Sequence, residues 1–263
     1  MLCFSLNPTQ WLVAALLAGG VVGWSRARGW LQPGGGRVAF LLGLVFFGLG
    51  GWRWSLGLVA FFLTSSVLTR WRASGEKSGR TARQVLANGL VPLLSLVLCP
   101  WLGPDRAWAM LHGGLAVAAA DTWATEIGMR SPSPPYSLRN GRPVPPGTSG
   151  AVSPWGLFGS LLGASFMAAL AVALHPSPQA LRLFFLFVVV GVAGSLLDSL
   201  LGAFWQGRLR CSRCHSIFEA GESHPCPGPY QSHRGWPWLT NDLVNLVTIL
   251  FGALLAACLV HSV

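Results

Sequence analysis

The feature that most constrains this chain is a series of apolar stretches separated by short polar loops. About 20 apolar residues are needed for an α-helix to span the hydrocarbon core of a bilayer. We identify eight such stretches, the second and third of which are short and joined at Trp52–Trp54. They are roughly Gln10–Trp24, Val38–Trp52, Ser55–Thr69, Gln84–Leu102, Ala107–Gly128, Pro154–Leu174, Leu181–Gln206 and Thr240–Val260. The sequence therefore predicts an all-α, polytopic membrane helix bundle with about eight transmembrane helices, forming a single integral membrane domain over residues 1–263.

The basic residues predict how these helices are oriented, because Lys and Arg concentrate in the cytoplasmic loops of membrane proteins. Of the 18 basic residues, 15 follow the first, third, fifth or seventh stretch, and Arg53, Arg106 and Arg182 are the other three. This partition predicts that both termini lie outside the cell. We expect the protein to lie in the plasma membrane. It also accounts for the net charge of +10, since basic loops lie beside an anionic lipid surface. We therefore expect the membrane as a partner and no nucleic acid.

Acidic side chains within these stretches are the first candidates for function. An ionised side chain at the centre of a bilayer costs roughly 2.5–3.5 kcal/mol, so a membrane helix that keeps one needs a use for it. Four of the eight acidic residues lie in or at the ends of the apolar stretches. They are Asp121, Glu126, Asp198 and Asp242.

Asp121 and Asp198 have the surroundings of a cation site. Thr125 lies one helical turn from Asp121, and Ser195 lies near Asp198 on the same face. Carboxylate and hydroxyl oxygens suit a hard cation such as Mg²⁺. Glu126 points about 140° away from Asp121 on a helix, so it serves a different partner or closes the site from its edge. The alternative use of all these side chains is hydrogen bonding between packed helices.

Two helix starts add further polar groups. The start of the eighth stretch carries Asn241, Asp242 and Asn245. Asp in the first turn of a helix is also an ordinary helix start, so Asp242 has a structural alternative. The segment before the fourth stretch and its first turn carry Lys77, Arg80, Arg83 and Asn88.

The loop before the sixth stretch has the composition of a phosphate-binding turn. Ser153 followed by Pro154 is typical of a helix N-cap and first helical position. Glycines before it let backbone N–H groups approach a ligand closely. The residues we expect to bind phosphate are Arg142, Gly147, Thr148, Ser149 and Gly150. The alternative is a rigid turn without a ligand.

The predicted topology brings all these groups to one side of the membrane. Asp121, Glu126 and Asp198 lie near the inner ends of helices that run inward. Asn88 and Asp242 lie near the inner starts of helices that run outward. We therefore expect them to meet at the cytoplasmic boundary, which suits chemistry between a soluble nucleotide and a lipid headgroup.

The loop over residues 207–239 has the spacing of a metal site. It is cytoplasmic in the predicted topology and too short to bury an independent core. Its candidate ligands are Cys211, Cys214, Cys226 and either His224 or His233. Two thiolates two residues apart with a second Cys/His pair downstream indicate a tetrahedral, structural Zn²⁺ site. The alternative is a set of reduced, unliganded thiols.

Four motifs in this order resemble one family. Residues 120–128 (ADTWATEIG), 141–150 (GRPVPPGTSG), 194–203 (GSLLDSLLGA) and 241–245 (NDLVN) are similar to the transmembrane protein 19 family. That family includes plant and cyanobacterial phytyl-phosphate kinases. The resemblance implies a kinase that converts an isoprenoid monophosphate to its diphosphate, with CTP or another nucleoside triphosphate as donor.

The resemblance implies a division of roles among the candidate residues. Asp121, Asp198 and Asp242 would hold Mg²⁺, with Glu126 at the edge of the site. The loop of Gly147–Gly150 with Arg142 would bind phosphates, and the cations of 77–83 would meet the nucleotide or the lipid phosphate. Two other classes stay open: a transporter or lipid flippase with carboxylates nearer the midplane, and a non-catalytic membrane scaffold organised by the Cys/His loop.

Overall fold

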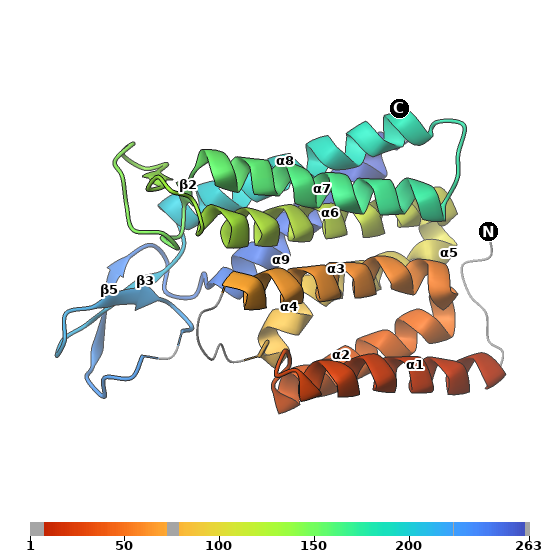
Figure 1. Ribbon diagram of the computed structural model, residues 1–263, viewed down its shortest axis with the longest axis horizontal. Helices are drawn as coiled ribbons and strands as arrows, with labels where there is room; N and C mark the ends of the chain where they lie inside the picture. Colours follow the sequence, from red (N-terminus) through yellow and green to blue (C-terminus); the bar gives the residue numbers. More distant parts are fainter. Residues whose placement is uncertain (1–7, 73–78, 223, 261–263) are drawn as a thin grey trace.

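The computed structural model describes residues 8–72, 79–222 and 224–260. The axes of its long helices are roughly aligned, and a small β-sheet projects from one end of the bundle (Figure 1). The helical elements are α1 (Pro8–Ala27), α2 (Pro33–Val45), the π-helix η1 (Phe46–Gly50), α3 (Gly51–Arg72), α4 (Ala82–Val97), α5 (Cys99–Leu102), α6 (Pro104–Gly128), α7 (Pro154–Leu174), α8 (Ala180–Phe204) and α9 (Asn241–Leu259). The strands are β1 (Tyr136–Ser137), β2 (Ala151–Val152), β3 (Arg208–Cys211), β4 (Ile217–Glu219) and β5 (Tyr230–Arg234).

The chain is a polytopic helical membrane protein. Within the described residues, four helical stretches are long and apolar enough to cross a bilayer, judged by length and composition. They are Pro33–Trp71, Pro154–Leu174, Ala180–Phe204 and Asn241–Leu259. The first of these is not one continuous helix but contains α2, η1 and α3, because Gly51 adopts a φ of +68° between η1 and α3 and the chain turns there. Each of the eight stretches predicted from the sequence is helical, although several boundaries move by a few residues.

Helix boundaries follow local signals in the sequence. The Ser153 Oγ accepts a hydrogen bond from the Gly156 backbone N at 3.0 Å, and Pro154 is the first residue of α7, as predicted. Thr240 caps α9 in the same way. The predicted stretch Gln84–Leu102 is broken after Val97, where α5 follows α4. Pro100 has no N–H with which to continue the hydrogen-bond ladder of α4.

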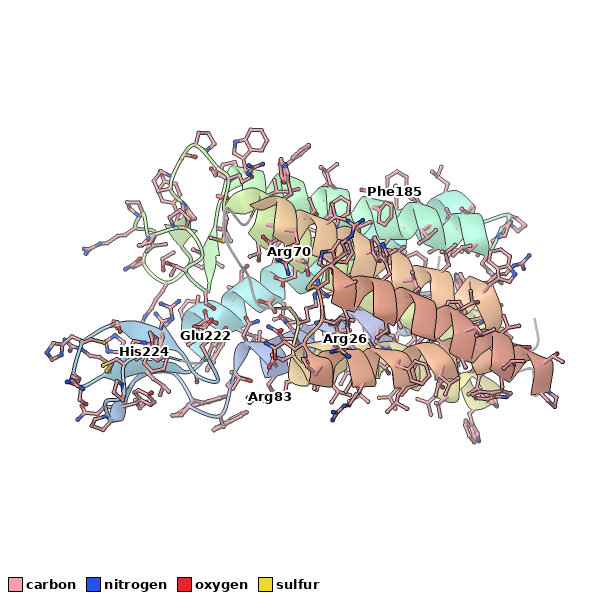
Figure 2. All side chains as sticks on the ribbon, turned by 60° about the horizontal axis from the view of Figure 1, so that its bottom comes forward. Arg26, Arg70, Arg83, Phe185, Glu222 and His224 are labelled. Carbon is pink, nitrogen blue, oxygen red and sulfur yellow. The ribbon has the colours of Figure 1, made fainter. Side chains whose placement is uncertain are left out.

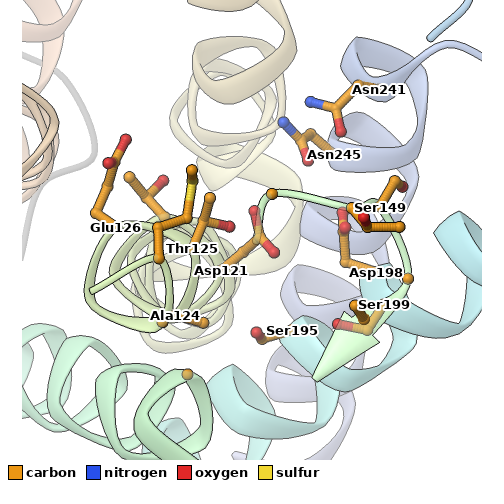
Figure 3. Close-up of a pocket in the computed structure, with 18 of the residues that line it drawn as sticks. Asp121, Ala124, Thr125, Glu126, Ser149, Ser195, Asp198, Ser199, Asn241 and Asn245 are labelled. Atoms are coloured by element: carbon orange, nitrogen blue, oxygen red, sulfur yellow. The ribbon is translucent and has the colours of Figure 1, made fainter. Parts of the chain in front are cut away.

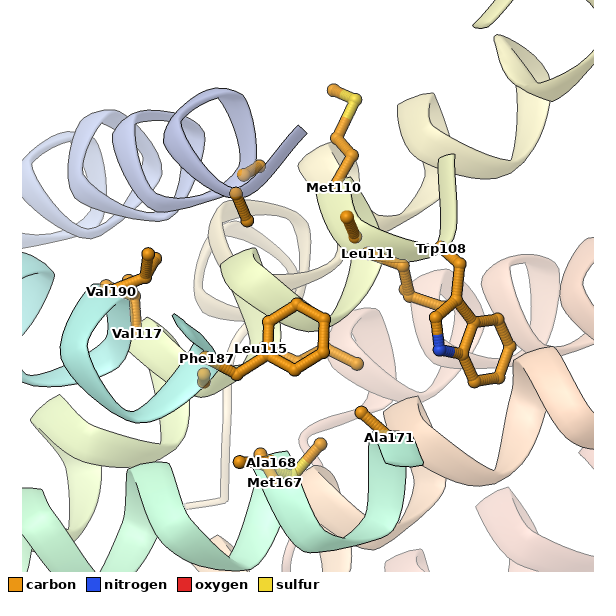
Figure 4. Packing of buried hydrophobic residues seen from close by; sticks show 14 of the residues in the cluster. Trp108, Met110, Leu111, Leu115, Val117, Met167, Ala168, Ala171, Phe187 and Val190 are labelled. Carbon is orange, nitrogen blue, oxygen red and sulfur yellow. The ribbon is translucent and has the colours of Figure 1, made fainter. Parts of the chain in front are cut away.

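Helix α6 is the centre of the bundle. All residues from Ala107 to Ala120 are buried, and α6 packs against α3, α4, α7, α8 and α9. Glycines permit this close approach, since a Cβ at Gly163 of α7 would lie 2.6 Å from the Ala119 carbonyl oxygen of α6. Larger side chains such as Leu115 and Phe187 fill the space between α6 and α8 (Figure 4). This packing fixes α6, α8 and α9 relative to one another.

The two longest loops contain strands, which the all-α prediction missed. In the loop between α6 and α7, β1 pairs antiparallel with β2. Residues 207–239, called the Cys/His module below, form an antiparallel sheet in the order β4-β3-β5. The strands of this sheet are only three to five residues long, which is too short for an alternation of apolar residues to identify them in the sequence.

Basic residues from different loops lie at the end of the bundle that carries the Cys/His module. Figure 2 shows Arg26, Arg70 and Arg83 at this end of their helices, whereas Phe185 lies farther along the bundle. Arg70 Nη2 donates a hydrogen bond to the Gly29 carbonyl oxygen, which ties α3 to the loop after α1. The loops that the charge pattern groups together therefore do share one end of the structure.

Candidate functional site

A polar cavity of about 610 Å³ opens at the end of the helices beside the Cys/His module. Its walls come from α3, α4, α6, α7, α8 and α9, from the loops before α4 and α7 and from the Cys/His module. The predicted site residues that line it are Arg80, Asn88, Asp121, Glu126, Gly147, Thr148, Ser149, Gly150, Asp198, Asn241, Asp242 and Asn245. Segments far apart in the sequence are thus brought into one cavity, which we call the polar cavity.

Asp121 of α6 and Asp198 of α8 point into the same part of the polar cavity (Figure 3). The two carboxylates lie close enough to repel each other electrostatically. Thr248 Oγ1 of α9 donates a hydrogen bond to Asp198 Oδ2 at 3.4 Å, and Ser195 and Ser199 stand beside it. Two half-buried carboxylates with hydroxyls around them are the oxygen ligands that a hard divalent cation takes, and a bound cation would relieve their repulsion.

Glu126 lies on the other side of α6 and has partners of its own (Figure 3). It is only 5% exposed, and its Oε1 accepts a hydrogen bond from Thr69 Oγ1 of α3 at 2.8 Å. The half-buried Arg80 attracts it electrostatically. Burial lowers the pKa of Arg80 to about 10, so Arg80 is still a cation at neutral pH. Of the two alternatives for Glu126, the geometry favours a separate partner on α3.

The loop before α7 is fixed against the end of α8. Gly150 has a φ of +74°, and a Cβ there would lie 2.2 Å from the Ala203 backbone N. Ser149 Oγ donates to Gln206 Oε1 at 2.8 Å, and the Ser149 carbonyl oxygen accepts from Arg208 Nη2 at 3.1 Å. These contacts hold the glycine-containing loop rigidly with its backbone on the wall of the polar cavity.

Three of the predicted cations are not found in this wall. Arg142 is exposed in a turn, where its backbone N–H donates to Asn140 Oδ1 at 3.2 Å. Arg83 is exposed in the first turn of α4 and attracts Asp242 electrostatically from outside the wall. Lys77 lies outside the described residues. Within the described part of the chain, Arg80 is the predicted cation that lines the polar cavity.

Glu219 of β4 reaches the polar cavity from the Cys/His module, and the sequence reading did not assign it to the site. Gln206 Nε2 donates to Glu219 Oε2 at 2.8 Å, and Gln206 is only 1% exposed, so one buried amide bridges Ser149 and Glu219. Burial raises the pKa of Glu219 above its usual value, which the neighbouring Glu222 reinforces and Arg208 opposes. The contact between Gln206 and Glu219 depends on how a short sheet folds back onto the helices, and no sequence pattern encodes that.

The Cys/His module gathers four metal-binding side chains. Cys211, Cys214, His224 and Cys226 offer ligand atoms that all lie within 4.8 Å of one another, and Cys214 Sγ is 3.1 Å from His224 Nε2. Tetrahedral coordination with Zn–S bonds of about 2.3 Å would place ligand atoms roughly 3.8 Å apart, so these four residues fit a metal ion such as zinc. Between the two histidine alternatives, the structure brings His224 into the cluster, and His233 is exposed on β5.

Hydrogen bonds around the cluster favour thiolate. Hydrogen bonding to Ser216 lowers the pKa of Cys214 to about 6, and His224 adds to this. The turn that contains the first two cysteines is closed by the His215 backbone N–H, which donates to the Cys211 carbonyl oxygen at 3.0 Å. A low thiol pKa and a closed turn both suit metal ligation.

Comparison with known proteins places the chain in a family. The family model described as "Integral membrane protein DUF92" matches residues 16–253, which include every element from α2 to β5 and most of α1 and α9. This chain belongs to the DUF92 family of integral membrane proteins. The resemblance to the transmembrane protein 19 family, predicted from four motifs, is confirmed. The polar cavity and the Cys/His module of this DUF92 protein both lie within the matched residues.

Three relatives from a plant and a cyanobacterium illustrate the range of similarity. Protein PGR of Arabidopsis thaliana is 30% identical, in a match that covers 95% of this chain and 96% of that protein. An uncharacterized membrane protein of Synechocystis sp. is 29% identical over 86% of this chain and 81% of its own length. Protein VTE6, chloroplastic, of Arabidopsis thaliana is 24% identical over 86% of this chain and 64% of its own length. No solved structure matches the chain.

Proposed function

We propose that this DUF92 protein is a membrane-embedded isoprenoid monophosphate kinase that uses a nucleoside triphosphate, CTP or another, at the cytoplasmic face of the membrane. The observation that carries the proposal is the meeting of Asp121, Asp198 and the loop of Gly147–Gly150 in one polar cavity at the end of the bundle. The resemblance to the transmembrane protein 19 family, which includes phytyl-phosphate kinases, supplies the reaction class.

Phosphoryl transfer depends mainly on positioning and charge neutralisation. Asp121 and Asp198, with Asp242 nearby, would hold Mg²⁺, which would neutralise charge on the triphosphate. Arg80 and the backbone of the loop before α7 would bind phosphate oxygens. An oxygen of the acceptor monophosphate attacks the γ-phosphorus, the bond from that phosphorus to the bridging oxygen breaks, and the nucleoside diphosphate leaves with the electron pair. The acceptor is largely ionised near neutral pH, so it needs little help from a general base.

The proposal is tested with purified protein in detergent. With Mg²⁺, one of the four common nucleoside triphosphates and a prenyl monophosphate, we expect the prenyl diphosphate and the nucleoside diphosphate in equal amounts. If no prenyl monophosphate is phosphorylated with any of the four, the kinase proposal fails. A transporter or flippase would then be the better candidate, although the polar cavity lies toward one end of the helices and not midway along them.

We also propose that the protein crosses the plasma membrane eight times, with both termini outside and the polar cavity facing the cytoplasm. The charge partition and the gathering of basic loops at one end support this orientation. Cysteine substitutions at Thr148 and Glu219 should be labelled by a membrane-impermeant reagent only from the cytoplasmic side, and one at Pro178 only from outside. Labelling of position 148 from outside would overturn the orientation.

We further propose that the cluster of the Cys/His module holds one structural Zn²⁺. The donor set has three thiols and one imidazole with no described carboxylate in the group, which suits zinc and not magnesium. Protein purified without chelators should carry about one zinc per chain by metal analysis. Finding no zinc in such protein would reject this site.

A further inference from the structure

A second, apolar cavity lies beside the polar cavity, between α1, α2, α3 and α4. Its wall is built almost entirely of aliphatic and aromatic side chains, among them Leu42, Phe47, Leu58 and Phe62. The small residues Ala18, Ala39, Gly43 and Gly89 also line it. Because they project little or no side chain, they leave open the space that larger residues would fill.

Arg80 and Asn88 line both cavities. The Arg80 guanidinium lies over the rings of Phe61 and Phe62, 5.7 and 5.5 Å from their centroids, and both rings belong to the apolar wall. A cation is thus held at the mouth of an apolar cavity. Such an arrangement matches an amphiphile with one anionic end and a hydrocarbon chain.

The apolar cavity extends well below the polar one. On α3, Thr69 lines the polar cavity and Leu58 lines the apolar cavity, eleven residues earlier in the same helix. At about 1.5 Å per residue, the two positions are roughly 16 Å apart along the helix axis. On α2 the lining reaches Phe47, within the π-helix η1. Arg80 itself lies over Phe62, four residues from Leu58, and along α2 and η1 the helical lining runs from Ala39 to Phe47, about 12 Å at 1.5 Å per residue. A hydrocarbon chain that starts at Arg80 could therefore enter the apolar interior between these helices.

We propose that the apolar cavity binds the hydrocarbon tail of the isoprenoid monophosphate and that Arg80 holds its phosphate at the entrance to the polar cavity. This inference rests on the proposed function for the identity of the ligand. It assigns α1 to α4 to acceptor recognition and leaves α6, α8 and α9 to bind the nucleotide and its metal. The length of the cavity would then select among acceptors by chain length.

The test is photolabelling, which requires no turnover. Full-length protein in lipid nanodiscs is irradiated with geranylgeranyl monophosphate that carries a diazirine near the far end of its tail, and the labelled peptides are identified by mass spectrometry. We expect labels in the α2 and α3 segments around Phe47 and Leu58, and we expect unlabelled geranylgeranyl monophosphate to compete them away. Arg80→Ala should raise the concentration of unlabelled geranylgeranyl monophosphate needed for competition at least tenfold, because the phosphate loses its cation.

Two identical substitutions on α3 provide the matched comparison. Val59 lines the apolar cavity, whereas Val67 is 53% exposed and lines neither cavity. Val59→Phe should reduce geranylgeranyl labelling at least tenfold, because the added ring fills part of the apolar cavity. Val67→Phe should leave the labelling unchanged.

Three results would overturn the inference. They are labels spread over lipid-facing residues, labels that a phospholipid displaces but the monophosphate does not, and equal effects of the two substitutions. The kinase proposal is tested separately, because labelling in the cavity without any diphosphate product would keep the tail site and reject the kinase. Diphosphate formation without labels in the cavity would support the kinase and reject the tail site.

Discussion

The two walls of the polar cavity are held in place by different physical means. The bundle wall carries Asp121 and Asp198 on α6 and α8, whose positions follow from a closely packed core of glycines, alanines and large apolar side chains. The wall from the Cys/His module carries Glu219, which is positioned by one buried amide and a short sheet. Core packing is cooperative and spread over many contacts, whereas the module depends on a few polar contacts and one ligand cluster. We therefore expect that the module can lose its position while the bundle stays folded.

The largest expected effect is on the bundle wall. Asp121→Asn and Asp198→Asn each keep the size of the side chain and remove the charge that a divalent cation needs. Each should lower turnover about a thousandfold, which corresponds to roughly 4 kcal/mol of transition-state stabilisation. Initial rates of diphosphate formation measure this.

Asp105→Asn is the matched control, because Asp105 lies on the same helix at its other end and contacts His175 Nε2 at 3.3 Å. It should leave the rate unchanged. If both Asp121→Asn and Asp198→Asn keep wild-type activity, the bundle wall is not the metal-binding wall and the kinase proposal loses its main support.

The second effect tests whether the module depends on its metal. Cys211→Ser combined with Cys214→Ser should remove the bound zinc and lower activity about ten- to a hundredfold, as loss of supporting groups around a site does in other metalloproteins. The bundle should keep its helical circular dichroism, because none of its core contacts involve these thiols. Zinc content, activity and helicity are measured on the same samples.

Cys258→Ser is the control for this double substitution, since Cys258 is a free, exposed thiol on α9. It should retain both zinc and activity. Loss of helicity together with loss of zinc would mean that the two walls fold as one unit and are not held in place independently.

A smaller effect is expected at the contact between the walls. Gln206→Leu leaves Ser149 and Glu219 without their shared partner, and an unpaired buried polar group costs about 1–3 kcal/mol. Part of that cost falls on the phosphate-binding loop, so the KM for the nucleotide should rise about three- to tenfold with a smaller change in kcat.

Gln179→Leu, on the exposed residue before α8, is the control and should change neither constant. An unchanged KM in Gln206→Leu would show that the loop keeps its position without the module.

The smallest effect is expected at Arg142, where the role implied by the family motif differs from the position in the structure. The motif of residues 141–150 predicts that Arg142 binds phosphate, whereas the structure places it in an exposed turn outside the polar cavity. We expect Arg142→Ala to change the nucleotide KM less than twofold and Arg80→Ala to raise the KM of the acceptor about tenfold or more. A large effect of Arg142→Ala would mean that the loop before α7 closes over the bound nucleotide.

Much of the site could be predicted because the position of a residue in a helical segment determines the helix face on which it lies. The periodicity of 3.6 residues per turn places Asp121 and Thr125 on one face, and the alternating basic loops place the ends of α6, α8 and α9 on one side. The Ser153-Pro154 helix start and the Cys211-x-x-Cys214 turn are local signals, and both appear in the structure as predicted. The family followed from four short motifs.

Tertiary structure alone decided which side chains enter the cavity. Arg80 lines it and Arg142 does not, although both are cations in loops at the same end of the bundle. Glu219 joins the site through a sheet that no pattern predicts, and the fold of the module places His224 in the Cys cluster while His233 lies exposed on β5. Helix faces and membrane sidedness arise from interactions between residues close in sequence or from the bilayer itself, so a single sequence encodes them directly. The placement of loops and short strands depends on contacts between residues 50 or more positions apart, such as Ser149 with Gln206, and these exist only once the chain has folded.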